Sequence, residues 1–261
     1  MQLHSIDTGV VDADDAARPL VVLHGLFGSA DNWRSHIKQW QQARRVVALD
    51  LRNHGRSPHA SGMRYAQMAA DVAESLDALE IEQFDLLGHS MGGKVAITLA
   101  RQQPRAVASL IVADIAPVPY EHGHDEIFAA MRRVVEGQPE SRREADALMA
   151  ESVDVAATRQ FLATNLVRDD AGILRWRVGL DEIADGYADI IAAPDGEGAY
   201  PGPALLLRGG DSPYVRDAHR EAVAAVMPEA TWQTLEGAGH WLHAEQPEAF
   251  QQALSRFFAS L

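Results

Sequence analysis

The 261-residue chain contains no cysteine. This absence excludes disulfide bonds, zinc sites built from thiolates and any mechanism that uses a cysteine nucleophile. The length is sufficient for one large α/β domain or two small domains. The 47% share of hydrophobic residues is that of a folded globular protein.

Basic residues are scarce relative to acidic ones. Lysine and arginine number 23 against 37 aspartates and glutamates, which leaves a formal net charge of −14. A chain this acidic repels the phosphates of nucleic acids and of anionic membrane surfaces. We therefore expect a small-molecule substrate, no nucleic-acid partner and no stable membrane association.

Long apolar runs are missing as well. No stretch approaches the ~20 apolar residues that a membrane-spanning helix needs. The first seven residues lack the basic and apolar pattern of a signal peptide. These absences lead us to expect a cytoplasmic protein.

The segment around Ser90 has the Gly-x-Ser-x-Gly pattern of a nucleophile elbow. In this motif a nucleophilic serine stands on a sharp turn between a strand and a helix. Gly88 and Gly92 leave room for the turn, because a side chain at either position would collide with the backbone. The following helix would point its N-terminal amides toward the site, where negative charge develops. Ser90 is therefore the candidate nucleophile.

Short apolar runs alternate with helix-length segments in the chain up to Asp114. We expect a short edge strand over residues 3–11, an acidic turn over residues 12–19 and buried strands over residues 20–23, 45–49, 84–87 and 109–113. Helices are expected over residues 31–42, 65–79 and 94–103. This alternation predicts an α/β fold with a mostly parallel central sheet and helices on both faces. Function in such sheets lies at the carboxyl ends of the strands, which here carry His24, Asp50, Ser90 and Asp114.

The alternation stops after Asp114. Residues 125–192 have a helical pattern in which we expect no strand, with helices over residues 127–135, 142–149, 155–166 and 174–191. Strands return over residues 204–208 and 231–235, with helices over residues 217–226 and 247–261. We interpret residues 1–116 and 201–261 as one core, and residues 117–200 as an inserted helical cap over the strand ends. Two sequential domains would leave the core without its last strands and closing helix.

A serine hydroxyl needs a general base, and that base needs a third group to orient it. In the nucleophile-elbow fold the chain order is serine, acid, histidine. His240 follows a predicted strand, and Gly237 and Gly239 let its loop turn back over the sheet. His240 is the predicted base, and we expect a structural role, or a place in the wall of the site, for His243.

The acid has two candidates. Many enzymes of this fold carry it in the loop after the strand expected here over residues 204–208. Position 212, where that acid would stand, is serine, and Asp211 comes one residue early. Asp114 follows the strand after the one that bears Ser90, and from there it can reach the same histidine. The pattern favours Asp114 and leaves Asp211 as the alternative acid.

The oxyanion hole needs backbone amides. Met91 directly follows the nucleophile and supplies one amide, and Leu26, in the loop after the first buried strand, supplies the other. Phe27, His89 and Trp241 are the expected substrate-pocket residues, with His89 packed against the core rather than reactive.

The remaining histidines carry weaker signals. His122 and His124 stand near Asp125, but histidines at spacing two in a loop are weak evidence for a metal site, so we predict none. His219 falls within a predicted helix and is expected at the surface.

Five segments together carry a resemblance to a known family. They are Leu23-His24-Gly25-Leu26-Phe27-Gly28-Ser29 with Asn32-Trp33, Asp50-Leu51-Arg52-Asn53-His54-Gly55-Arg56-Ser57, Gly88-His89-Ser90-Met91-Gly92-Gly93-Lys94, Ala113-Asp114-Ile115-Ala116-Pro117 and Gly237-Ala238-Gly239-His240-Trp241. The chain resembles the α/β-hydrolase superfamily along essentially its whole length and, within it, the YbfF-like esterases. This resemblance implies a serine hydrolase that cleaves short- to medium-chain acyl esters, and extends to acyl-CoA thioesters. It also supports Asp114 as the acid and implies no cofactor.

Other functions share these features. The same fold and triad serve cofactor-free perhydrolases or haloperoxidases and hydrolases of carbon–carbon bonds, which a substrate panel would separate. A noncatalytic receptor of this fold would bind a small ligand without turnover, but the intact Ser90, His240 and Asp114 argue against it.

Overall fold

The computed structural model describes residues 1–10 and 17–261. Most of the acidic turn expected over residues 12–19 lies outside the described residues. The part that is described, from Ala17 onward, belongs to a strand.

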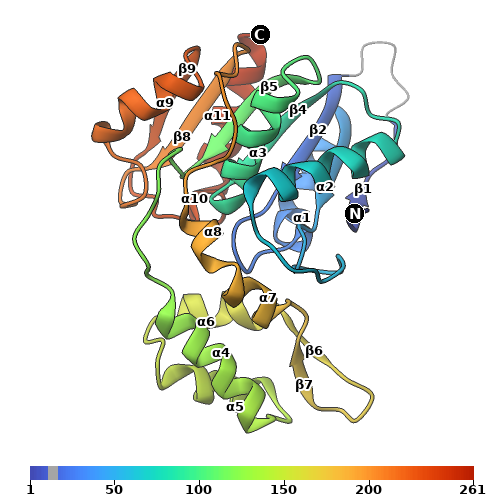
Figure 1. Cartoon of the computed structure of the whole chain (residues 1–261), viewed down its shortest axis with the longest axis vertical. Helices are drawn as coiled ribbons and strands as arrows, with labels where there is room; N and C mark the ends of the chain where they lie inside the picture. The colour runs from blue at the N-terminus through green and yellow to red at the C-terminus, as the bar shows by residue number, and fades with distance from the viewer. Residues whose placement is uncertain (11–16) are drawn as a thin grey trace.

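A seven-stranded sheet forms the centre of the structure, in the order β1-β3-β2-β4-β5-β8-β9 (Figure 1). Its strands span Ser5–Asp7 (β1), Ala17–Leu23 (β2), Arg44–Leu49 (β3), Phe84–His89 (β4), Val107–Ala113 (β5), Ala204–Gly209 (β8) and Ala230–Leu235 (β9). Every neighbouring pair is parallel except β1 and β3, which are antiparallel. The mostly parallel sheet is therefore confirmed. The strand expected over residues 3–11 is shorter, because among the described residues of that segment the pairing with β3 spans Ser5–Asp7.

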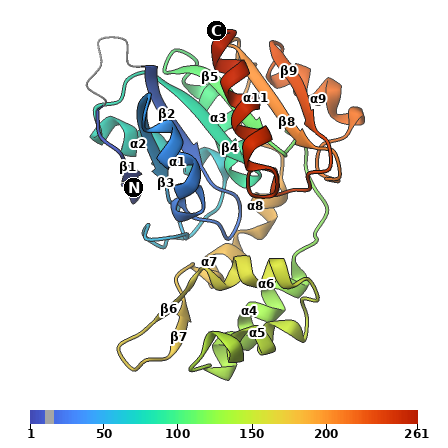
Figure 2. The same cartoon turned by 180° about the vertical axis from the view of Figure 1, so that it is seen from behind.

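Helices cover both faces of the sheet, as the sequence predicts. The helices α2 (Tyr65–Ala78), α3 (Met91–Gln102) and α9 (Arg220–Val226) lie on the face seen in Figure 1. On the opposite face, seen in Figure 2, lie α1 (Arg34–Trp40) and α11 (Pro247–Ala259), and the short α10 (Leu242–Glu245) precedes α11. The helix expected over residues 31–42 is split, because a 3-10 turn over Ala30–Trp33 precedes α1.

Strand β2 shows why both faces need cover. Val21 and Leu23 belong to the core cluster that includes α2 and α3, whereas Leu20 and Val22 belong to the cluster that includes α1 and α11. Successive side chains of a strand point to opposite faces, so a continuous apolar run must be buried on both.

The chain between β5 and β8 leaves the sheet. It forms α4 (Asp125–Gly137), α5 (Arg142–Ala150), α6 (Ala156–Ala163), β6 (Leu166–Arg168), β7 (Leu174–Trp176), α7 (Leu180–Asp185) and α8 (Tyr187–Ile191). Both views place α4 to α7, with β6 and β7, beyond one end of the sheet, and α8 leads back toward it (Figures 1 and 2). The chain then rejoins the sheet at β8, directly beside β5.

The expectation that residues 125–192 contain no strand is wrong. β6 and β7 form an antiparallel hairpin, which shortens the helix expected over residues 155–166 and replaces the start of the one expected over residues 174–191. Its turn is closed by hydrogen bonds between Asp169 and Ile173 and between Gly172 and Asp169, and Gly172 has a φ of 83°. Strands of three residues are too short for a period of two to emerge from the sequence.

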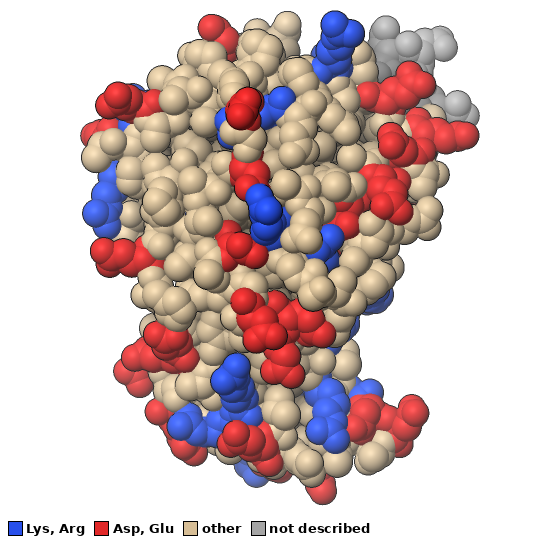
Figure 3. Space-filling model, viewed as in Figure 1, with Lys and Arg blue, Asp and Glu red and all other residues tan. Residues whose placement is uncertain are grey.

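Acidic and basic side chains are interspersed over the face drawn in Figure 3, and a group of acidic side chains lies over α7. Among the described residues, no helix has both the length and the apolar character that crossing a bilayer would require.

Candidate active site

Ser90 stands at the sharp turn between β4 and α3. Its φ of 53° and ψ of −122° form a strained conformation that few residues other than glycine adopt. A Cβ atom on Gly88 would lie 2.2 Å from the carbonyl oxygen of Gly92, and one on Gly92 would lie 2.4 Å from that of His24. Both glycines are therefore required by close backbone contacts, as the motif predicts.

A line of hydrogen bonds joins Ser90, His240 and Asp114. The Nε2 atom of His240 lies 3.0 Å from the Ser90 hydroxyl, and its Nδ1 atom lies 2.7 Å from Oδ2 of Asp114. His240 reaches this place from the loop between β9 and α10, where Gly237 has a φ of 72°. Asp114 is fully buried at the end of β5.

Asp211 is not part of this line. Its backbone N–H donates to the carbonyl of Ala238 at 2.9 Å, and its side chain is exposed to solvent. Among the described residues, its carboxylate accepts no hydrogen bond. The structure therefore brings Asp114, and not Asp211, to His240.

Three further groups hold this line, in roles that the sequence did not predict. The Ser212 hydroxyl donates to Oδ2 of Asp114, and the backbone N–H of Gly209 donates to Oδ1 at 3.0 Å. The ring of Tyr214 stacks on His240 with 4.0 Å between the ring centroids. The serine at position 212, where many enzymes of this fold carry the acid, was the feature of the sequence that could have indicated a polar contact with Asp114.

The loop after β2 forms a tight turn beside Ser90. The carbonyl of Gly25 accepts the N–H of Gly28 at 2.9 Å and Nδ1–H of His24 at 2.8 Å. The N–H of Phe27 donates to Nε2 of His54 at 3.1 Å, so this amide is already engaged. The amides of Leu26 and Met91 have no hydrogen-bond acceptor among the described residues, and both residues line the cavity.

Buried histidines support the site without taking part in the line. The Nε2–H of His89 donates to the carbonyl of His240 at 2.8 Å, and burial holds the pKa of His89 well below its usual value. His243 stacks on Trp33 at 4.4 Å, and burial lowers its pKa to about 3. Burial likewise lowers the pKa of His54 to about 3, which keeps its Nε2 free to accept the N–H of Phe27.

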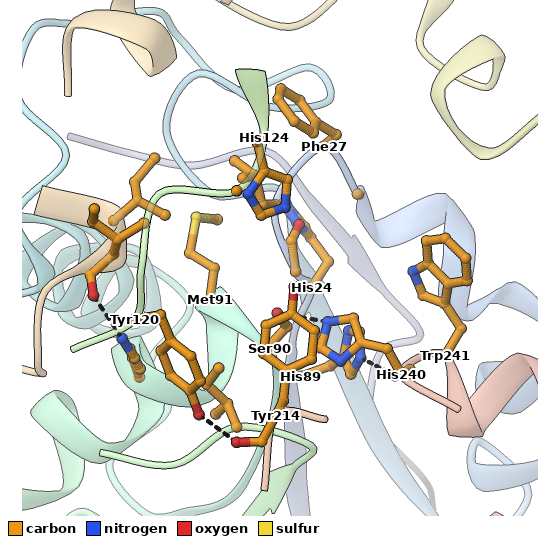
Figure 4. Close-up of a pocket in the computed structure, with 18 of the residues that line it drawn as sticks. His24, Phe27, His89, Ser90, Met91, Tyr120, His124, Tyr214, His240 and Trp241 are labelled. Carbon is orange, nitrogen blue, oxygen red and sulfur yellow. Dashed lines mark hydrogen bonds between the residues drawn. The ribbon is translucent and has the colours of Figure 1, made fainter. Parts of the chain in front are cut away.

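A cavity of about 740 Å³ opens above Ser90 (Figure 4). The expected pocket residues Phe27, His89 and Trp241 all line it. The ring of Phe27 meets Phe128 of α4 at 5.7 Å, and the ring of Trp241 meets Phe161 of α6 at 5.4 Å. A volume in this range suits a small molecule with mainly apolar surface.

Some cavity residues were misjudged or missed. His219, expected at the surface, is half-buried in the cavity wall. Lys94, which was not singled out, lies buried in the same wall, donates to the carbonyl of Ala192 at 2.5 Å and has its pKa lowered to about 7 by burial. Its position one helical turn after Ser90 was the feature of the sequence that could have placed Lys94 near the cavity.

His124 also faces the cavity (Figure 4). Its Nδ1 is hydrogen-bonded to the Tyr187 hydroxyl at 2.5 Å, whereas His122 contacts Asp125 at 3.2 Å. In the part of the chain that the structure describes, no three histidine, aspartate or glutamate side chains gather as metal ligands would.

Comparisons with known proteins agree with this fold and motif set. Residues 18–247 match the model of the alpha/beta hydrolase fold family. Esterase YbfF of Escherichia coli (strain K12) is 37% identical over 240 residues, which make up 92% of this chain and 92% of that protein. The sn-1-specific diacylglycerol lipase ABHD11 of Xenopus laevis is 41% identical over 250 residues, 93% of this chain and 80% of that protein. A solved structure of a marine microorganism esterase superposes with a TM-score of 0.93 at 36% identity and covers 98% of this chain and 99% of that one. The resemblance to YbfF-like esterases is confirmed, and the chain belongs to the α/β-hydrolase fold family.

Proposed function

We propose that this protein is a serine hydrolase that cleaves carboxylic esters through an acyl-enzyme on Ser90. The observation that carries the proposal is the continuous line of hydrogen bonds from Ser90 through His240 to Asp114. The names of its relatives, which include an esterase and a lipase, support the same reaction.

Acylation begins when His240 takes the proton of the Ser90 hydroxyl through Nε2. The serine oxygen attacks the ester carbonyl, and Asp114 stabilises the imidazolium that forms. His240 then gives its proton to the departing alkoxide, which leaves as an alcohol. Water, deprotonated by the same histidine, releases the acid and restores Ser90.

The amides of Leu26 and Met91 form the proposed oxyanion hole. Met91 is the first residue of α3, so its N–H has no acceptor within the helix. The N–H of Phe27 is held by His54, which leaves Leu26 as the donor from this loop. Loss of one such donor typically lowers kcat by about 10²- to 10³-fold.

Residues 117–200 form the proposed cap, and residues 1–116 and 201–261 the core. Phe128 and Phe161, which contact the pocket residues Phe27 and Trp241, both come from the cap. A cavity of about 740 Å³ favours short- to medium-chain acyl groups and has room for a thioester of similar size. The diacylglycerol lipase among the relatives makes acylglycerols a substrate class to include.

Labelling with a fluorophosphonate tests the proposal. The reagent should attach to Ser90 and abolish turnover of p-nitrophenyl esters, and Ser90→Ala should neither label nor turn over. A panel of acyl esters, acyl thioesters and acylglycerols then ranks the substrates. Full ester turnover by the labelled protein would overturn the proposal, and an absence of turnover on every member of the panel would favour a receptor.

A further inference from the structure

Phe27 has an unusual backbone conformation for its residue type. It is the third residue of the Gly25–Gly28 turn and has a φ of 59°. Turns with a positive φ at this position normally place glycine or asparagine there, because a bulky side chain disfavours the left-handed region. Something outside the turn must therefore hold Phe27 in place.

Contacts from two separate parts of the chain hold Phe27. Its N–H donates to Nε2 of His54, in the loop after β3, at 3.1 Å. Its carbonyl accepts Nδ2–H of Asn165, which lies between α6 and β6 in the proposed cap, at 2.7 Å. The ring of Phe128, also in the proposed cap, packs against the ring of Phe27 at 5.7 Å.

Asn165 is itself rigidly placed for this contact. Its side chain is fully buried, its N–H donates to the carbonyl of Leu162 at 3.0 Å, and its carbonyl accepts the N–H of Arg177 at 2.8 Å. Its Oδ1 has no partner among the described residues. A buried side-chain amide normally has hydrogen-bond partners for both its oxygen and its nitrogen. The side chain of Asn165 uses its nitrogen alone, so the hydrogen bond to Phe27 is what a polar residue contributes at this position.

The orientation of the Leu26 amide depends on this turn. The carbonyl of Gly25 and the N–H of Leu26 belong to one trans peptide and point in opposite directions. The N–H of Gly28 holds that carbonyl at 2.9 Å, so the N–H of Leu26 is presented on the other side. If Phe27 relaxed to a negative φ, the turn would change and this N–H would turn away.

We propose that Asn165 is a positioning residue that keeps the oxyanion loop in its reactive conformation. The hydrogen bond to Phe27 makes a complete oxyanion hole depend on the cap being seated on the core. This inference rests on the proposed function, because it assigns the role of the loop that holds Leu26.

The test compares Asn165→Ala with His59→Ala. His59 also joins the core to the cap, through a hydrogen bond from its Nε2–H to the carbonyl of Arg177 at 3.0 Å, but it does not contact Phe27. Asn165→Ala should lower kcat by about 10-fold or more, up to the ~10²- to 10³-fold cost of a lost oxyanion donor, with KM changed by less than about 2-fold. The rate of phosphonate labelling should fall in parallel, because the phosphoryl oxygen occupies the same hole. His59→Ala should leave both rates unchanged.

A double-mutant cycle separates positioning from general cap packing. Glycine at position 27 adopts a positive φ without cost, so Asn165→Ala should lower kcat much less in a Phe27→Gly background than in the native chain. Thermal unfolding verifies that each variant is folded, and Asn165→Leu repeats the test without leaving a cavity.

Three results would overturn the inference: an unchanged kcat in Asn165→Ala, an equal loss in His59→Ala, or an equal effect of Asn165→Ala in both backgrounds. Failure of the proposed function would look different, because the native protein itself would then neither label at Ser90 nor turn over esters.

Discussion

Replacing Asp114 by asparagine tests the acid assignment by exchanging one carboxylate oxygen for an NH₂ group. In the native site Oδ1 accepts the N–H of Gly209 at 3.0 Å, and Oδ2 accepts Nδ1–H of His240 at 2.7 Å. The N–H of Gly209 requires an acceptor, so the amide oxygen of the asparagine keeps that place. Its NH₂ group must then face His240.

The NH₂ group donates hydrogen bonds and cannot accept one from Nδ1–H. The imidazole therefore takes the tautomer with its proton on Nε2, and it no longer accepts the proton of Ser90. The equivalent change in the serine-protease triad lowers kcat by about 10⁴-fold, or about 5 kcal/mol of transition-state stabilisation. Asp114 is fully buried, so water cannot restore the missing acceptor, and we expect a loss of the same order.

The assay is kcat on p-nitrophenyl butyrate, with thermal unfolding to verify that the variant is folded. Asp211→Asn is the matched control. Because Asp211 is exposed, the kcat of this variant should stay within about 2-fold of that of the native protein. A folded Asp114→Asn that keeps most of its activity, or an Asp211→Asn that loses it, would refute the assignment.

Three more predictions concern Ser212, the buried histidines and the elbow glycine Gly88. Ser212→Ala removes the hydroxyl that donates to the carboxylate of Asp114, so Asp114 is held less firmly against His240 and kcat should fall, whereas an unchanged kcat would contradict this role. Burial lowers the pKa of His54 and His243 to about 3, so the unfolded chain binds more protons than the folded chain below about pH 6.5. The free energy of unfolding should therefore fall from pH 6.5 toward pH 3, by about 2 kcal/mol per histidine at pH 5, and the melting temperature should fall with it. His243→Phe should make that fall shallower, and a melting temperature independent of pH would count against the burial argument. Gly88→Ala puts a Cβ 2.2 Å from the carbonyl oxygen of Gly92, so the yield of folded protein and the rate of Ser90 labelling should collapse, and a native labelling rate would disprove the steric argument.

The sequence by itself determined the sheet and the proposed nucleophile. Apolar runs such as the one over residues 20–23 must be buried on both faces, which requires helices on both sides. The elbow at Ser90 depends on Gly88 and Gly92; the contact that confines Gly88 is with the backbone of Gly92, four residues on, whereas Gly92 is confined by the carbonyl of His24. The loop of His240 was likewise predictable, because its glycines are adjacent to it in sequence.

Only the tertiary structure decided between the two acids. Asp114 and Asp211 both follow strands, and the serine at position 212 favours Asp114 without deciding between them. The pairing of β5 with β8 sets Ala113 opposite Leu207, which puts Asp114 beside Gly209 and Ser212. The register between β5 and β8, whose paired residues are about 90 positions apart, is a long-range property that no local sequence pattern predicts.

The same reason explains the other features that the sequence did not predict. The β6–β7 hairpin has strands too short for a pattern, and the hydrogen bond from Asn165 to Phe27 joins residues 138 positions apart. Sterics between neighbouring residues can be read along a chain, whereas contacts between its distant parts exist only once the whole core has packed. The proposed chemistry at Ser90 belongs to the first kind, and the support of its proposed acid and oxyanion loop belongs to the second.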